Sequence, residues 1–204
     1  MRKIDISCWP RKEIYDHFSG VKDPFYMVSF DLDVTNIYEY AKKEGISFYY
    51  SMIYGVTKSI NSVENFRYTI RDKEIYLLDE RIPSFTYLEK DSDLFKILTV
   101  PMEGSLIDFA EAAEKKAKEQ SVFLDKGSEN DELIYISCLP WVDLTAVTNE
   151  GMDDPLDNIP RLCWGRIREN GNNKVLNISF EVNHRFIDGI HFKKFAEEFA
   201  ALRF

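Results

Sequence analysis

The sequence predicts an α/β fold, arranged as a two-layer α+β sandwich in which helices cover one main face of a mixed β-sheet. Segments that alternate apolar and polar residues are interspersed with segments of helical spacing, and no regular strand–helix–strand repeat runs through the chain. The 204 residues are 45% hydrophobic, which is enough to bury one sizeable core. No Pro/Gly/Ser-rich linker and no internal repeat divides them. We therefore expect a single domain over residues 1–204.

Capping residues set the element boundaries in the first third of the chain. Pro10 suits the first turn of a short helix, where its missing backbone N–H leaves no hydrogen bond unmade. Thr35 can cap the start of another helix, and Gly45 can end it. The predicted elements are a helix over residues 9–18, a strand over 25–34, a helix over 35–43 and a largely buried helix over 48–62.

The rest of the chain consists mostly of short strands, with one exposed helix and one closing helix. Arg71-Asp72-Lys73 and Asn170-Gly171-Asn172 have the composition of turns between paired strands. A run dense in Glu, Lys and Ala predicts the exposed helix. The predicted elements are strands over residues 66–70, 74–78, 84–88, 132–137, 161–168 and 174–184, and helices over 105–122 and 190–199.

Composition excludes several classes of function. The net charge of −9 and the pI near 4.9 argue against nucleic acid or an anionic membrane as the main partner. No secretory apolar region opens the chain, and no apolar stretch approaches the roughly 20 residues that span a bilayer. Cys8, Cys138 and Cys163 have neither a disulfide-framework nor a zinc-site spacing. We expect a reduced cytoplasmic protein, whose many Phe and Tyr residues suit an apolar pocket or a large subunit interface.

The most informative segment joins the last strand to the last helix. His184 continues the apolar side of the predicted strand, and Asp188 follows four residues later. Gly189 is expected to give the backbone a tight bend at this corner. An inward imidazole needs hydrogen-bond partners, and a general base needs its tautomer fixed by one. Two interpretations of His184 therefore remain: a catalytic base, or a core histidine capped by a turn aspartate.

Ser137 and Arg11 are the next candidates. Ser137 ends an alternating strand, and Pro140 halts regular pairing just after it. A hydroxyl in that place could donate to a developing oxyanion, although an ordinary strand-end serine looks the same in the sequence. Arg11 could pair with Asp188 and lock the corner, or it could be solvated at the surface.

Other chemistries have less support in the sequence. His184, Asp188 and His191 could be read as metal ligands, but no cysteine or glutamate cluster accompanies them. No Gly-x-Ser-x-Gly elbow, Walker-type loop or Gly-x-Gly-x-x-Gly stretch occurs. Serine-hydrolase, nucleotide-hydrolysis and dinucleotide mechanisms are thus unsupported, and no metal is expected.

Several motifs together resemble the chloramphenicol acetyltransferase family over most of the chain, and with it the fold of CoA-dependent acyltransferases. The terminal signature of that family, His-His-x-x-x-Asp-Gly, is similar to the segment from Asn183 to Gly189. The separation between Ser137 and His184 also agrees with the family. The other matching motifs are Asp5-Ile6-Ser7, Trp9-x-Arg11-Lys12-Glu13, Asn65-Phe66-Arg67, Phe85-Thr86, Asp93-x-Phe95 and Ser137-x-x-Pro140-Trp141-Val142-x-x-Thr145.

The resemblance implies a role for each matched residue. His184 would remove a proton from an acceptor hydroxyl as it attacks the thioester of acetyl-CoA, and Ser137 would hydrogen-bond the oxyanion. Asp188 would be structural, paired with Arg11. The implied cofactor-binding residues are Trp141 along the CoA tunnel and, as a basic patch for the anionic CoA, Arg166, Arg168 and Lys174. The implied acceptor-pocket residues are Phe95, Phe18, His17 and Cys163.

Departures from the family pattern concern the acceptor more than the mechanism. Asn183 and Arg185 flank His184 in a way that is closer to the 2-oxo acid dehydrogenase acyltransferases, and Cys163 stands where the family commonly has a threonine. His17 and Phe18 stand where the resistance enzymes usually carry aromatic pocket residues. The resemblance implies a homotrimeric O-acetyltransferase for chloramphenicol or a similar hydroxylated small molecule, with antibiotic resistance as its setting and active sites at subunit interfaces. The alternative is a catalytically silent relative that binds a ligand or serves in an assembly.

Overall fold

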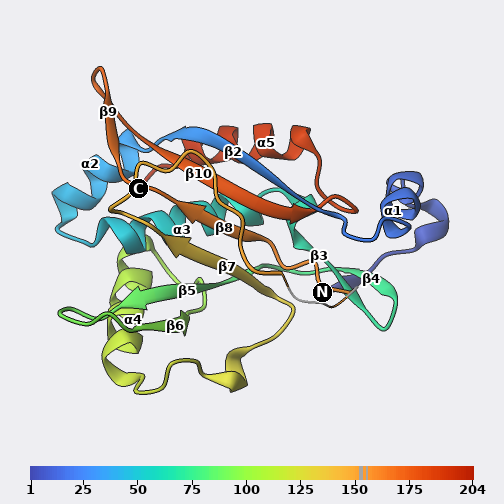
Figure 1. The fold of residues 1–204 in the computed structure, drawn as a ribbon, viewed down its shortest axis with the longest axis horizontal. Coiled ribbons are helices and arrows are strands. Elements are labelled where there is room, and N and C mark those ends of the chain that lie inside the picture. The colour runs from blue at the N-terminus through green and yellow to red at the C-terminus, as the bar shows by residue number, and fades with distance from the viewer. Residues whose placement is uncertain (152–153, 155) are drawn as a thin grey trace.

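A mixed β-sheet forms the centre of the molecule (Figure 1). In residues 1–151, 154 and 156–204, which the computed structural model describes, seven strands make up this sheet in the order β2-β10-β8-β7-β5-β6, with β9 paired to β10. β7 runs parallel to both β5 and β8, and the other pairs are antiparallel. The strands are β2 (Phe25–Asp33), β5 (Ile82–Leu88), β6 (Phe95–Thr99), β7 (Leu133–Cys138), β8 (Arg161–Trp164), β9 (Arg168–Asn170) and β10 (Asn173–Asn183). The predicted mixed sheet is confirmed.

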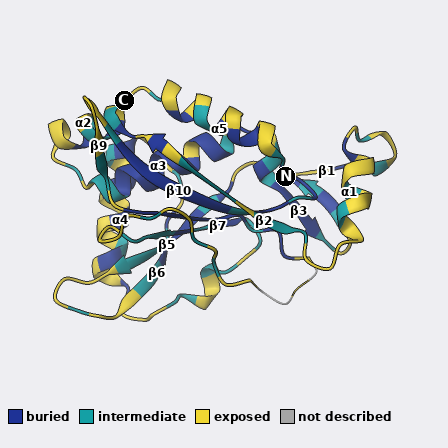
Figure 2. Cartoon of the chain, turned by 45° about the horizontal axis from the view of Figure 1, so that its top comes forward, coloured by how far each residue is buried: buried dark blue, intermediate teal, exposed yellow. Residues whose placement is uncertain are grey.

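Helices cover one main face of this sheet, as the sequence predicted (Figure 1). The helices are α1 (Lys12–Ser19), α2 (Thr35–Glu44), α3 (Phe48–Asn61), α4 (Leu106–Glu119) and α5 (Gly189–Ala201). α3 is buried along most of its length and contacts α2, α4 and α5, whereas α5 is exposed on its outer side (Figure 2). α1 lies apart from them, near the N-terminus.

The predicted strands needed corrections in several places. β1 (Arg2–Lys3), β4 (Glu74–Leu77) and β3 (Tyr68–Arg71) form a separate small sheet, in which β1 lies at the strand-like run that opens the chain, and the edge strand β6 was not expected. The strand predicted over 66–70 begins later, because residues 64–67 form a 3-10 turn. The strand predicted over 161–168 is interrupted after Trp164. There the chain around Leu144 crosses so closely that a Cβ on Gly165 would lie 2.5 Å from the Leu144 Cβ.

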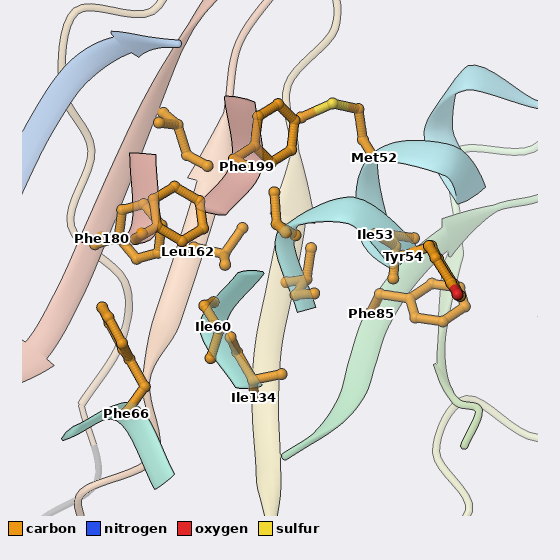
Figure 3. Packing of buried hydrophobic residues seen from close by; sticks show 14 of the residues in the cluster. Met52, Ile53, Tyr54, Ile60, Phe66, Phe85, Ile134, Leu162, Phe180 and Phe199 are labelled. Atoms are coloured by element: carbon orange, nitrogen blue, oxygen red, sulfur yellow. The ribbon is translucent and has the colours of Figure 1, made fainter. Parts of the chain in front are cut away.

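Aromatic and branched side chains from both layers make one continuous core (Figure 3). Phe180 of β10 meets Phe195 of α5 edge to face, with ring centroids 4.9 Å apart. Ile60 from α3 and Ile134 from β7 are fully buried in the same cluster. Burial of each large apolar side chain contributes about 1.5–3 kcal/mol, so this core fixes the sheet and therefore the ends of its strands.

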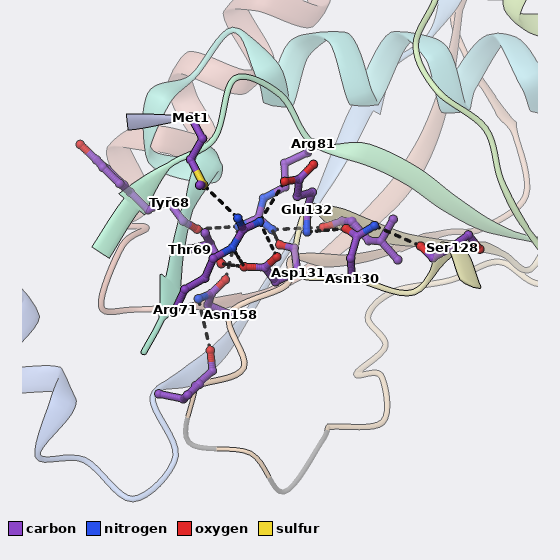
Figure 4. Close-up of polar contacts among 12 residues, drawn as sticks. Met1, Tyr68, Thr69, Arg71, Arg81, Ser128, Asn130, Asp131, Glu132 and Asn158 are labelled. Atoms are coloured by element: carbon purple, nitrogen blue, oxygen red, sulfur yellow. Dashed lines mark hydrogen bonds and ion pairs between the residues drawn. The ribbon is translucent and has the colours of Figure 1, made fainter. Parts of the chain in front are cut away.

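Arg81 is the one fully buried arginine in the described part of the chain, and all five of its N–H groups have acceptors (Figure 4). It donates to the carbonyl oxygens of Phe66, Tyr68, Asp131 and Leu133 and to the side-chain oxygen of Asn158. Burial lowers the pKa of Arg81 to about 10, so the guanidinium stays charged near neutral pH. It ties the small sheet to β7.

Replacement of Arg81 by methionine should destabilise the protein by about 3 kcal/mol or more, because buried carbonyl oxygens lose their only charged donor. Thermal melting followed by circular dichroism measures the loss. Arg203→Met is the matched control, since Arg203 donates only to carbonyls of its own chain end. Equal melting temperatures for the two variants would contradict the role given to Arg81.

Candidate active site

The corner between β10 and α5 is fixed by hydrogen bonds to its backbone. Four successive carbonyl oxygens accept bonds from side chains of distant elements or from the loop itself. Arg11 donates to the carbonyl oxygens of His184 (3.0 Å) and Arg185 (2.8 Å). Asn65 donates to the carbonyl oxygen of Phe186 (2.8 Å). The carbonyl oxygen of Ile187 accepts from both Tyr26 (3.1 Å) and the ring of His184 (3.0 Å). Satisfied buried carbonyls make the loop rigid.

Gly189 does not have the predicted role at this corner. It is the first residue of α5, it lacks a left-handed φ, and a Cβ placed on it would meet no atom within 4 Å. The bend is made by the bonded carbonyls rather than by a glycine, so the expectation of a tight glycine turn was wrong.

The imidazole of His184 is held in one orientation and one tautomer. Its ring is stacked on Phe18 (centroids 4.0 Å apart) and on Tyr26 (4.2 Å). Nδ1 lies 3.0 Å from the carbonyl oxygen of Ile187 and 3.3 Å from Oδ1 of Asp188. Because a carbonyl oxygen can only accept, Nδ1 carries the hydrogen and Nε2 keeps its lone pair. The side chain is about a third exposed, so Nε2 can receive a proton.

Asp188 and Arg11 form a two-point ion pair beside this histidine. One guanidinium nitrogen lies 2.7 Å from Oδ1, and a second nitrogen bonds Oδ2. The hydrogen bond from Arg11 is the main reason why the pKa of Asp188 lies below its ordinary value. The Asp188 N–H donates to Nδ1 of His191, and burial lowers the pKa of that histidine to about 4. His191 therefore caps α5, and its engaged Nδ1 argues against the metal-ligand reading.

Asn183 holds the histidine loop from the strand side. Its side-chain oxygen accepts hydrogen bonds from the backbone N–H and Nε of Arg185, and its amide donates to the carbonyl of Asp157 (3.0 Å). Burial lowers the pKa of Arg185. The supporting roles of Asn183, Asn65, Tyr26 and His191 were not predicted; only the Asn65-Phe66-Arg67 motif gave any signal.

Ser137 and Cys138 face two different cavities, because successive residues of a strand point to opposite faces. Ser137 lines a cavity of about 370 Å³ together with Phe95. Cys138 lines a cavity of about 570 Å³ between the sheet and the start of α3. Thr86 lines both cavities, so the strand ends around Ser137 separate two spaces of ligand size.

The other predicted binding residues are divided between these places. Trp141 and Arg166 line the larger cavity, with Arg166 paired to Asp143. Arg168 is paired with Asp31 and Lys174 with Glu169, and neither lines that cavity. Phe18 stacks on His184 and contacts His17, away from Ser137. Cys163 is buried beside Ser137 in the strand register, and burial raises the pKa of its thiol.

One chain does not bring His184 and Ser137 together. In the sheet, Ser137 is paired with Cys163, and Cys163 is paired with Ser179 of β10. His184 lies five residues beyond Ser179 along β10. Its position in the sheet is therefore two strand spacings across and five residues along from Ser137, a separation of roughly 19 Å. A site that uses both residues needs a second copy of the chain.

A histidine that keeps a basic Nε2 and a serine hydroxyl on a cavity wall are the groups that general-base acyl transfer requires. The family model "CAT: Chloramphenicol acetyltransferase" matches residues 1–200. The chain therefore belongs to the chloramphenicol acetyltransferase family.

Individual relatives agree with this assignment. The chain is 27% identical to a chloramphenicol acetyltransferase of Campylobacter coli, over 96% of this chain and 95% of the relative. It is 27% identical to one of Clostridioides difficile, over 98% and 94%. A solved chloramphenicol acetyltransferase shares the fold with a TM-score of 0.89 at 23% identity, covering 98% of both chains. The dihydrolipoamide acetyltransferase of Azotobacter vinelandii shares it at 0.67 and 18%, over 91% and 85%.

Among the described residues, no helix combines the length and the apolar character that a bilayer crossing requires.

Asp188→Asn should lower the stability by about 2 kcal/mol and the activity with it, because Arg11 loses its charged partner. The pKa of Asp188 is lowered on folding, so its stabilisation is complete above the ordinary value of 3.8 and is lost as the pH falls through the lowered pKa. The difference in melting temperature between wild type and variant should therefore be constant above pH 5 and shrink below pH 3.8.

Asp16→Asn on α1 is the control for this variant. Asp16 is exposed and pairs only with Lys12, so its loss should cost little at any pH. A normal melting temperature together with low activity in Asp188→Asn would contradict the structural role of the ion pair.

Proposed function

We propose that this protein transfers the acetyl group of acetyl-CoA to a hydroxyl of a small molecule, with chloramphenicol as the first acceptor to test. The observation that carries the proposal is the 3.0 Å contact between Nδ1 of His184 and the carbonyl oxygen of Ile187, which assigns the hydrogen to Nδ1 and the basic lone pair to Nε2. The curated relatives with matching length are named chloramphenicol acetyltransferases, which suggests the acceptor.

The reaction follows from the roles of His184 and Ser137. Nε2 takes the proton of the acceptor hydroxyl while the oxygen attacks the thioester carbonyl. The Ser137 hydroxyl donates to the resulting oxyanion. When the tetrahedral intermediate collapses, the C–S bond breaks, and the leaving thiolate receives the proton from the imidazolium. The products are the acetyl ester and CoA.

The two cavities are assigned to the two substrates. We assign the larger cavity to CoA, with Trp141 on its wall and Arg166 as the cation nearest to it. Arg168 and Lys174 would have to exchange Asp31 and Glu169 for CoA phosphates, so they are weaker candidates. The smaller cavity, with Phe95, would take the acceptor. His17 and Phe18 would reach the acceptor from the side of His184, and Cys163 would lie behind Ser137.

We propose a homotrimer in which His184 of one subunit faces Ser137 of the next. The roughly 19 Å that the strand register places between these residues in one chain supports a shared site. A head-to-tail interface that closes after three copies gives three equal sites. The free cysteines Cys8, Cys138 and Cys163 fit a cytoplasmic enzyme, and antibiotic resistance is the proposed setting. The dihydrolipoamide acetyltransferase likeness concerns the fold alone.

His184→Ala should reduce thiol release from acetyl-CoA by about 10²–10⁴-fold, because no general base remains. The release is measured with a thiol-reactive dye, with and without chloramphenicol and other hydroxylated acceptors. Lys193→Ala is the control, since Lys193 is exposed on α5 and pairs with Glu197, so this variant should keep the wild-type rate. A wild-type rate in His184→Ala would contradict the assignment of the base. No release from the wild type with any acceptor would favour a silent, ligand-binding relative.

Mixed oligomers test whether the site is shared. His184→Ala and Ser137→Ala should each be nearly inactive alone, whereas trimers that contain both variants should regain about one third of the sites, because one of their three interfaces pairs an intact histidine with an intact serine. The variants carry different tags, are refolded together, and are purified on both tags before assay. Mixtures as inactive as the separate variants would place both residues of a site in one chain.

A further inference from the structure

The smaller cavity has a polar wall beyond Ser137. On neighbouring strands, Ser84, Tyr135 and Arg161 are paired in one row, and Ser137 and Cys163 in the next row on the same face. Residues two apart in a strand are separated by roughly 7 Å. Ser84, Tyr135 and Arg161 all line the cavity with Ser137. An acceptor whose hydroxyl lies at Ser137 would therefore extend its other end toward this polar row.

Two polar atoms next to this row have no hydrogen bond within the described residues. They are Oε1 of Glu129 and Nδ2 of Asn149, and both residues line the cavity. Each atom is buried in the absence of ligand, and a buried polar atom without a partner is costly. One atom is an acceptor and the other is a donor, so a single hydroxyl group could satisfy both.

Both residues are anchored at the cavity wall by another hydrogen bond. Tyr135 donates to the second carboxyl oxygen of Glu129 (3.0 Å), and the backbone N–H of Asn149 donates to Glu181 (2.6 Å). Arg161 does not pair with Glu129, because it is paired with Asp157 (2.5 Å). The Glu129 carboxylate and the backbone of Asn149 are thus held beside the cavity, as expected of a preorganised subsite.

We propose that Glu129 and Asn149 form a specificity subsite that selects acceptors with a second polar group able to donate and accept, such as a hydroxyl or a primary amide, roughly 7 Å from the acylated hydroxyl. The inference rests on the proposed function, since the cavity is taken to be the acceptor site. A diol or a hydroxyphenyl alcohol fits both atoms. An acceptor with a methyl group in that place leaves both unpaired.

The test compares 2-(4-hydroxyphenyl)ethanol with 2-(4-methylphenyl)ethanol, which differ by one hydroxyl in place of a methyl. Wild-type protein should prefer the hydroxyl compound by about tenfold in kcat/KM for thiol release and in the dissociation constant from calorimetry, which equals about 1.4 kcal/mol. In Glu129→Met and in Asn149→Leu the preference should fall to twofold or less (about 0.4 kcal/mol).

Glu103→Gln is the control, because Glu103 is exposed and lines neither cavity; it should keep the wild-type preference. Melting curves check that each variant folds, and the two variants test the two atoms separately. Thiol release without a preference in the wild type, or an unchanged preference in both variants, would overturn the subsite. No thiol release with any acceptor, with the binding preference retained, would overturn the proposed function and leave the subsite standing.

Discussion

The chemistry proposed for His184 depends on the guanidinium of Arg11. This group bonds two carbonyl oxygens of the loop and both oxygens of Asp188, so one side chain fixes the backbone and the carboxylate together. The loop so held presents the Ile187 carbonyl to Nδ1 of His184, and that contact decides which nitrogen is free. A carboxylate that relayed charge would need the imidazole as its closest hydrogen-bond partner. Asp188 bonds Arg11 more closely than His184, so its contribution is positional.

The sheet keeps His184 away from the cavity that Ser137 lines. Strands in register place Ser137 and the polar row of Ser84, Tyr135 and Arg161 on one face, while the long β10 carries His184 past the end of β8. The strands therefore fix both the wall of this cavity and its distance from His184. The proposed shared site depends on this geometry of the strands rather than on flexibility of a loop.

Hydrophobic periodicity in the sequence predicted the elements that depend on neighbouring residues, and it missed those that depend on distant partners. The alternation in β10 and the change of period after His184 are visible in the sequence. The pairing of Arg11 with Asp188 was one of two interpretations of Arg11, and the family resemblance favoured it. β6 was missed because an edge strand has little burial and is defined by its pairing with β5. The partners Tyr26 and Asn65 lie 161 and 121 residues from the carbonyls they bond. Arg168 and Lys174 were proposed for CoA because CoA is an anion, and the sequence does not reveal that these residues form ion pairs with Asp31 and Glu169.

The treatment of buried polar groups distinguishes structural sites from binding sites in this fold. Arg81 lies in the deepest part of the chain, and every one of its donors is satisfied. Thr57, Arg67 and Gln120 each leave one atom unpaired among the described residues, but none of them lines either cavity. Glu129 and Asn149 leave an acceptor and a donor unpaired on the wall of the same cavity. Since the fold satisfies a buried charge as demanding as Arg81, the complementary pair of unmet hydrogen bonds in the smaller cavity is the observation on which the proposed subsite rests.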